Sequence, residues 1–81
     1  MNKRYADGFP PVEAKTARED VAAQVLRARK EAHLTQQNLA DLAGTQKSNI
    51  SRMESGRYNP SLDFLVKVAT SMGKELSVKL Q

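Results

Sequence analysis

Apolar residues recur at helical spacing along most of this chain. From Val21 to Ala32 they return every three or four positions, which is typical of one buried face of an amphipathic helix. Thr16 followed by Glu19 matches a capping box, in which a hydroxyl and a carboxylate satisfy the free N–H groups at a helix start. The pattern therefore predicts a first helix from Thr16 to about Ala32.

Three shorter helices are predicted from the residues that begin and end them. The second, 36–43, ends before Gly44, because glycine tolerates the left-handed conformation common after a helix. The third covers 46–54, and the fourth starts at the Ser61 cap and ends before the next glycine. The expected inward residues of these helices are Leu39, Ala40, Leu42, Ile50, Met53, Leu62, Leu65, Val66, Ala69 and Met72.

The two ends of the chain depart from this spacing. Residues 1–15 contain proline, glycine and scattered charges, and we expect a flexible arm. The C-terminal segment, 74–81, alternates apolar and polar residues as a half-buried strand does. Its apolar residues are Leu76, Val78 and Leu80. A lone strand cannot satisfy its backbone, so we expect it to pair with the same segment of a second copy, the alternative being a frayed end or a continuing helix. The helical domain between the ends is then 16–73.

The fold class expected is all-α, a small bundle of four to five helices with a short C-terminal strand paired across a dimer. A chain of 81 residues forms one domain with a thin core, to which a second copy would add buried surface. Its 13 basic and 9 acidic residues give a net charge of +4, which suits a polyanionic partner without proving one. There is neither an apolar signal core nor a run long enough to span a membrane, so we expect a cytoplasmic protein.

The sequence offers little for catalysis. His33 is the one histidine and stands at the end of a predicted helix, where a capping or solvated role is the simpler interpretation. The chain has no cysteine, no metal-ligand spacing and no phosphate-binding loop. We therefore expect no enzyme activity, no metal and no cofactor.

The second and third predicted helices, joined by a short turn at Gly44, have the helix-turn-helix arrangement, in which the later helix lies in a major groove of DNA. With Ile50 and Met53 inward, the polar residues left outside are Gln46, Lys47, Ser48, Ser51 and Arg52. Lysine and arginine can donate to guanine, and glutamine can bridge adenine. On spacing alone, a merely solvated face explains these residues equally well.

Candidate phosphate contacts flank this helix. Thr35 and Gln36 stand at a helix start, where free N–H groups and the helix dipole favour an anion. Arg57, Tyr58 and Asn59 follow the third helix and are candidates for contacts with the DNA backbone. Thr45, in the turn, completes this set.

Residues 24–73 resemble the phage-repressor-like helix-turn-helix family (Cro/cI-type, Xre). The resemblance is carried by Leu34-Thr35-Gln36, by the run from Ile50 to Gly56, and by Asn59-Pro60-Ser61-Leu62. It implies that Gln36 contacts a phosphate, that Lys47, Ser48 and Ser51 read base edges, and that Arg52 reaches bases or backbone. It also implies a structural ion pair between Arg29 and Glu54. Because Gln46 stands where a Ser or Thr cap is usual, Thr45 is expected to cap the third helix instead.

The C-terminal strand makes the chain most similar to antitoxins of the HigA and HipB kind. This resemblance implies a homodimer that binds a palindromic double-stranded operator, represses its own operon and neutralises a toxin. The arm would then grip the toxin through Tyr5, Phe9 and Val12, and a plain disordered tail is an equal alternative. A stand-alone regulator with no toxin, and a toxin inhibitor that mainly binds protein, stay open as alternatives.

Overall fold

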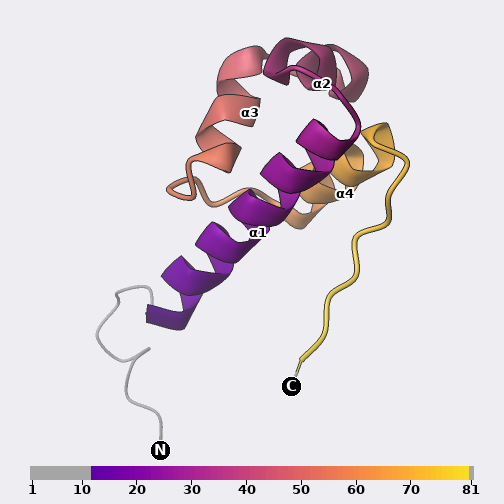
Figure 1. Cartoon of the computed structure of the whole chain (residues 1–81). Coiled ribbons are helices and arrows are strands. Elements are labelled where there is room, and N and C mark those ends of the chain that lie inside the picture. Colours follow the sequence, from indigo (N-terminus) through magenta and orange to yellow (C-terminus); the bar gives the residue numbers. More distant parts are fainter. Residues whose placement is uncertain (1–11, 81) are drawn as a thin grey trace, which may run out of the picture.

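Four helices form the fold in the computed structural model, which describes residues 12–80. They are α1 (Val12–Glu31), α2 (Gln36–Ala43), α3 (Lys47–Glu54) and α4 (Leu62–Ser71). The long α1 runs diagonally beside the other three, and α2 and α3 meet at an angle near its C-terminal end (Figure 1). Among residues 12–80, no helix has both the length and the apolar character needed to cross a membrane.

The core lies where α2, α3 and α4 meet, and α1 covers it. Leu39, Ile50, Met53 and Val68 are its largest fully buried side chains. Ala40, Ala43 and Leu65 complete the cluster, and Val21, Val25, Tyr58, Phe64, Met72 and Leu76 pack against it. The buried residues of α3 are therefore the two expected from the sequence, and they fix which side of this helix faces outward.

Three residues expected inside are exposed instead. Leu42 is 60% exposed, because the buried positions of α2 are Leu39, Ala40 and Ala43. In a helix of 3.6 residues per turn, those three share one side and position 42 lies about a quarter turn away. Leu62 and Val66 are 62% and 48% exposed, so the apolar face of α4 is wider than the surface that this chain buries.

The ends of α1 differ from the simplest expectation. The helix begins at Val12, so the predicted start at Thr16 is wrong, and it ends one residue before Ala32. At its C-terminus His33 adopts φ 58°, and its N–H donates to the Lys30 carbonyl while the N–H of Leu34 donates to that of Arg29. This is a Schellman ending with histidine at the usual glycine position, which accounts for His33 as a capping residue.

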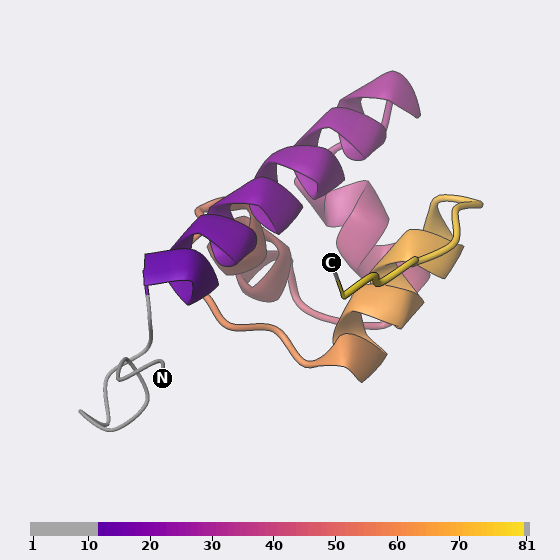
Figure 2. The ribbon, with the colours of Figure 1, turned by 90° about the horizontal axis from the view of Figure 1, so that it is seen from below.

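The segment after α4 leaves the helix through Gly73 and crosses α4 in the view from below (Figure 2). Together with α1 and α4 it lines a groove whose walls include Val21, Val25, Leu65 and Met72. Leu76 is half-buried there, whereas Val78 and Leu80 are exposed. None of residues 12–80 is in a β-ladder, so in the single chain this segment is not the expected strand.

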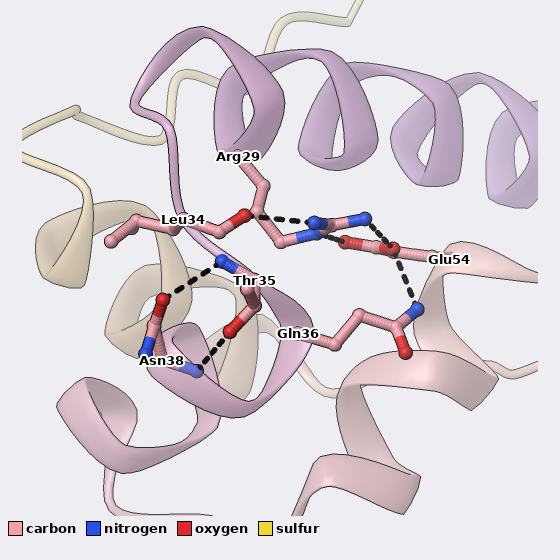
Figure 3. Close-up of polar contacts among 6 residues, drawn as sticks. All are labelled: Arg29, Leu34, Thr35, Gln36, Asn38 and Glu54. Carbon is pink, nitrogen blue, oxygen red and sulfur yellow. Dashed lines mark hydrogen bonds and ion pairs between the residues drawn. The ribbon is translucent and has the colours of Figure 1, made fainter.

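A half-buried ion pair joins α1 to α3. Arg29 donates from Nε to Glu54 Oε2 at 2.7 Å and from Nη2 to Glu54 Oε1 at 3.0 Å, so the contact is bidentate. Its third nitrogen, Nη1, donates to the Leu34 carbonyl at 2.9 Å (Figure 3). The hydrogen bond to Glu54 raises the pKa of Arg29 even though burial opposes it. One guanidinium therefore holds α1, the turn before α2, and the end of α3.

Gly56 sets how closely α1 crosses the loop after α3. It is buried with φ +80°, and a Cβ added there would lie 3.3 Å from Glu19 Cγ and 3.4 Å from Glu19 Cα. Gly44 also has a positive φ, +68°, but a Cβ there would meet nothing within 4 Å. Alanine substitutions at the two glycines therefore separate the free-energy cost of the left-handed backbone conformation from the cost of steric crowding.

Replacing Gly56 by Ala is expected to lower the free energy of unfolding more than Gly44→Ala does. Both variants lose about 1–2 kcal/mol of unfolding free energy, because a residue with a side chain must adopt a left-handed conformation. Only Gly56→Ala also crowds α1. Urea unfolding followed by circular dichroism measures both losses. Equal losses would show that the contact between Glu19 and the loop contributes nothing.

Glu54→Ala is expected to cost about 3–5 kcal/mol, because it leaves a guanidinium without its acceptor. The Arg29 side chain is only 11% exposed, so water replaces the lost carboxylate poorly. The paired variant Arg29→Met with Glu54→Leu removes both charges and should lose less than Glu54→Ala. If both variants unfold at the same urea concentration, burial of the unpaired charge does not explain the loss.

Candidate nucleic-acid interface

The start of α2 is fixed by a capping box around Thr35. The Thr35 hydroxyl accepts from the Asn38 N–H at 3.0 Å, and the Asn38 carbonyl oxygen Oδ1 accepts from the Thr35 N–H at 3.1 Å (Figure 3). The N–H groups of Gln36 and Gln37, the first two helical residues, have no acceptor within the helix. Thr35 therefore shapes the helix start, and the backbone beside it supplies donors suited to an anion.

The side chain of Gln36 lies between α2 and α3. Its Nε2 donates to Glu54 Oε1 at 3.0 Å, so the residue expected to contact a phosphate is tied to the ion pair with Arg29 (Figure 3). No pattern in the sequence indicates this bond, because it joins residues 18 positions apart on different helices. It links the two helices of the helix-turn-helix at their outer edge.

The outward face of α3 carries most of the residues expected to read bases. Ile50 and Met53 are 0% and 1% exposed and point into the core. The remaining positions on α3 are polar, and those exposed are Lys47, Ser48, Ser51 and Arg52. Gln46 is exposed too, directly before the helix, so the five candidates form one surface.

The turn before α3 differs from the expectation for Thr45. The N-cap residue is Gln46, with φ −92° and ψ 150°, and its side chain makes no capping hydrogen bond. The Thr45 hydroxyl instead accepts from Asn49 Nδ2 at 2.8 Å. The prediction that Thr45 caps α3 is therefore wrong, because the chain turns into the helix one residue later and the hydroxyl meets a side chain.

Asn49 is a residue of this surface that sequence analysis missed. Besides its bond to Thr45, its Oδ1 accepts from Arg52 Nη2 at 3.4 Å. The Arg52 guanidinium also lies over the ring of Tyr58, 6.0 Å from its centroid. Asn49 lies four residues from Thr45 and three from Arg52, and these helical spacings could have indicated its two contacts. Arg52 is thus held along α3 from two sides.

The loop after α3 presents the remaining phosphate candidates. The Ser55 hydroxyl donates to the Arg52 carbonyl at 2.6 Å and accepts from the Arg57 N–H at 3.2 Å, which shapes the turn. Arg57 and Asn59 are exposed. Tyr58 is half-buried and meets Phe64 edge to face, with ring centroids 6.5 Å apart. Tyr58 therefore anchors the loop to α4.

The charge of this surface has one sign. Between residues 45 and 59 the basic residues are Lys47, Arg52 and Arg57, and the one acidic residue is Glu54. The Glu54 side chain is 5% exposed and already paired with Arg29. Basic side chains are thus presented to solvent without a competing exposed carboxylate, as expected of a surface that binds a polyanion.

Other expected site residues lie away from this surface. Leu76, Val78 and Leu80 follow α4, in the segment beside the groove. Tyr5 and Phe9, expected to bind a toxin, lie outside the described residues, as does the side chain of Val12.

Comparison with known proteins identifies the family. Residues 25–79 match the helix-turn-helix family, which is more than half of the chain. An HTH-type transcriptional regulator of Methanothermobacter thermautotrophicus is 43% identical over 47 residues, covering 58% of this chain and 68% of the relative. The immunity repressor protein of Bacillus phage phi105 is 40% identical over 57 residues, covering 70% of this chain and 40% of the repressor.

A third relative and a solved structure extend the comparison. An HTH-type transcriptional regulator of Haemophilus influenzae is 33% identical over 55 residues, covering 68% of this chain, and the chain spans about half of that relative's length (56%). A chain of a toxin-antitoxin module from Streptococcus pneumoniae is 29% identical with a TM-score of 0.67. That likeness covers 99% of this chain and 94% of the other.

These matches agree with the geometry of α2 and α3 and with the basic surface that they present. The chain belongs to the helix-turn-helix family, whose members are DNA-binding transcriptional regulators and not enzymes.

Proposed function

We propose that this protein is a sequence-specific repressor that inserts α3 into the major groove of an operator. The observation that carries the proposal is the exposed polar and basic face of α3, seated by Ile50 and Met53 on the core. In this role Gln46, Lys47, Ser48, Ser51 and Arg52 read base edges. The phosphates on either side are held by the start of α2, with Gln36 foremost, and by the loop at Arg57.

The contacts of each residue on this surface indicate its role in DNA binding. Lys47 has an exposed side chain at the start of α3, where it can donate to guanine. Arg52 is restrained by Asn49 and Tyr58, so it loses less conformational freedom when it binds a base or phosphate. Thr35 and Thr45 already bond within the protein, so they act through the backbone that they shape.

We further propose that the repressor is a homodimer on a palindromic operator. Support comes from apolar side chains that a single chain leaves exposed, Leu62 and Val66 on α4 and Val78 and Leu80 beyond it. Residues 74–80 also carry backbone groups outside any β-ladder, which a second copy of the segment can satisfy. A two-fold dimer would place two α3 helices about one turn of DNA apart.

The finer biological role that we propose is that of an antitoxin that represses its own operon, in the cytoplasm. The likeness to a chain of a toxin-antitoxin module over nearly the whole chain supports it. Tyr5 and Phe9, together with Val12 at the start of α1, are then the proposed toxin contact. A stand-alone repressor is the second candidate, favoured by the identity to a phage immunity repressor. A small toxin-like reading frame beside the gene, whose product is retained by this protein in a pull-down, would distinguish the two.

Lys47→Ala and Arg52→Ala are each expected to weaken binding to a duplex selected by this protein from a random-sequence pool. A good base contact contributes roughly 1–3 kcal/mol, and its loss should relax specificity at one position of the site. Gel-shift titration of each variant against the selected duplex and single-base changes in it gives both quantities.

Lys67→Ala and Arg27→Ala are the matched controls, because they remove the same charges from exposed positions on α4 and α1. They should change affinity little. If all four variants lose the same affinity, net charge and not the face of α3 governs binding.

Val78→Lys combined with Leu80→Lys is expected to turn the dimer into monomers by placing charges where the two segments meet. Their side chains are 66% and 99% exposed in the single chain, so the helical fold should survive. Sedimentation velocity measures the change, and Ser77→Lys, on the alternate side of the segment, is the control. A double variant that sediments as a stable dimer would contradict pairing through this segment.

A further inference from the structure

Glu54 accepts more hydrogen bonds than an ion pair requires. Its Oε1 accepts from Arg29 Nη2 and from Gln36 Nε2, both at 3.0 Å, and its Oε2 accepts from Arg29 Nε at 2.7 Å (Figure 3). Arg29 alone joins α1 to α3, so the bond to Gln36 is not needed for that contact. It attaches the first residue of α2 to the last residue of α3.

This bond fixes which way the Gln36 amide faces. An ionised carboxylate has no proton to donate, so the amide must present its nitrogen, and not its oxygen, to Glu54. Figure 3 shows the nitrogen turned toward Glu54 and the oxygen turned away. One N–H is used by Glu54, and the same nitrogen carries a second N–H that can donate to another acceptor.

Arg29 makes this arrangement compatible with an anion. A lone carboxylate behind Gln36 would repel a phosphate, but the guanidinium neutralises it through two hydrogen bonds. Both side chains are largely shielded from water, at 11% and 5% exposure, so neither presents its charge directly to the outside. A phosphate that approaches the start of α2 therefore meets N–H donors of fixed direction and not an unpaired carboxylate.

We propose that Glu54 is a positioning residue for DNA binding, which acts through Gln36 by aiming its amide N–H, together with the start of α2, at a backbone phosphate. Glu54 itself does not touch the DNA. The inference rests on the proposed DNA-binding function, and it assigns to Glu54 an effect on affinity that is separate from its effect on stability.

Glu54→Gln distinguishes this role from a purely structural one by the sign of its effect. The change removes a negative charge, so a merely structural Glu54 predicts that the folded variant binds the selected duplex as tightly as the parent or more tightly. A positioning role predicts binding that is weaker by about tenfold or more. The new amide at position 54 can donate as well as accept, so it no longer fixes the orientation of the Gln36 amide. Affinity is measured by fluorescence anisotropy and corrected for the folded fraction from urea unfolding.

A double-mutant cycle keeps the test valid if Glu54→Gln does not fold. The paired variant Arg29→Met with Glu54→Leu leaves the net charge unchanged and removes the acceptor. It is combined with Gln36→Ala. If Glu54 acts through Gln36, the paired variant and Gln36→Ala weaken binding to similar extents, and the triple variant is no weaker than Gln36→Ala alone. Fully additive losses, or tight binding by the paired variant, would overturn the proposal.

A neutral methylphosphonate at single positions of the selected duplex identifies the phosphate. One position should weaken the parent protein about tenfold and leave Gln36→Ala and the paired variant unaffected. If every position acts equally on all proteins, Glu54 has no role in aiming. If the parent protein selects no duplex from the pool, it is the DNA-binding function that fails, and the two failures are thereby told apart.

Discussion

The bidentate contact between Arg29 and Glu54 is the constraint on which the arrangement of this small domain depends. The core of α2, α3 and α4 is made of few side chains, and α1 covers it with mostly half-buried residues. One guanidinium meets α3 and the turn before α2 at once. A single misplaced residue at this junction would change the angle between the two helices that are proposed to face the DNA.

The same ion pair between Arg29 and Glu54 is connected by hydrogen bonds to residues at the surface. Glu54 accepts from Gln36, Gln36 begins α2, and α2 begins beside the capping box of Thr35 and Asn38. In the same last turn of α3, Asn49 and Tyr58 restrain Arg52. The surface proposed to contact DNA is therefore held by hydrogen bonds and ring contacts, which reduces the conformational freedom lost on binding.

Much of the fold could be predicted from local signals. Gly44 and Ser61 mark helix ends through conformation and capping, and both act as expected. The start of α1 differs from the prediction, because Thr16 and Glu19 match a capping box inside a helix that begins directly after two prolines. Proline is favoured at the start of a helix, because its N–H is not needed there and its φ suits the helix, so two prolines directly before Val12 also indicate this earlier start.

What the sequence could not supply were relations between helices. The exposure of Leu42 depends on which neighbour α2 meets, and the bond from Gln36 to Glu54 depends on how α2 crosses α3. The exposed apolar side chains of α4 likewise have no explanation within one chain. Periodicity gives the apolar face of a helix, whereas only packing shows how much of that face the chain itself covers.

Amide NMR spectra of the full chain, recorded during titration with its selected duplex, show whether α3 and its two flanks form the DNA-binding surface. The largest shifts are expected on residues 35–37, 46–52 and 57–59, while the exposed side of α4 around Val66 changes little. Shifts concentrated on α4 and residues 74–80, with α3 unchanged, would contradict this expectation.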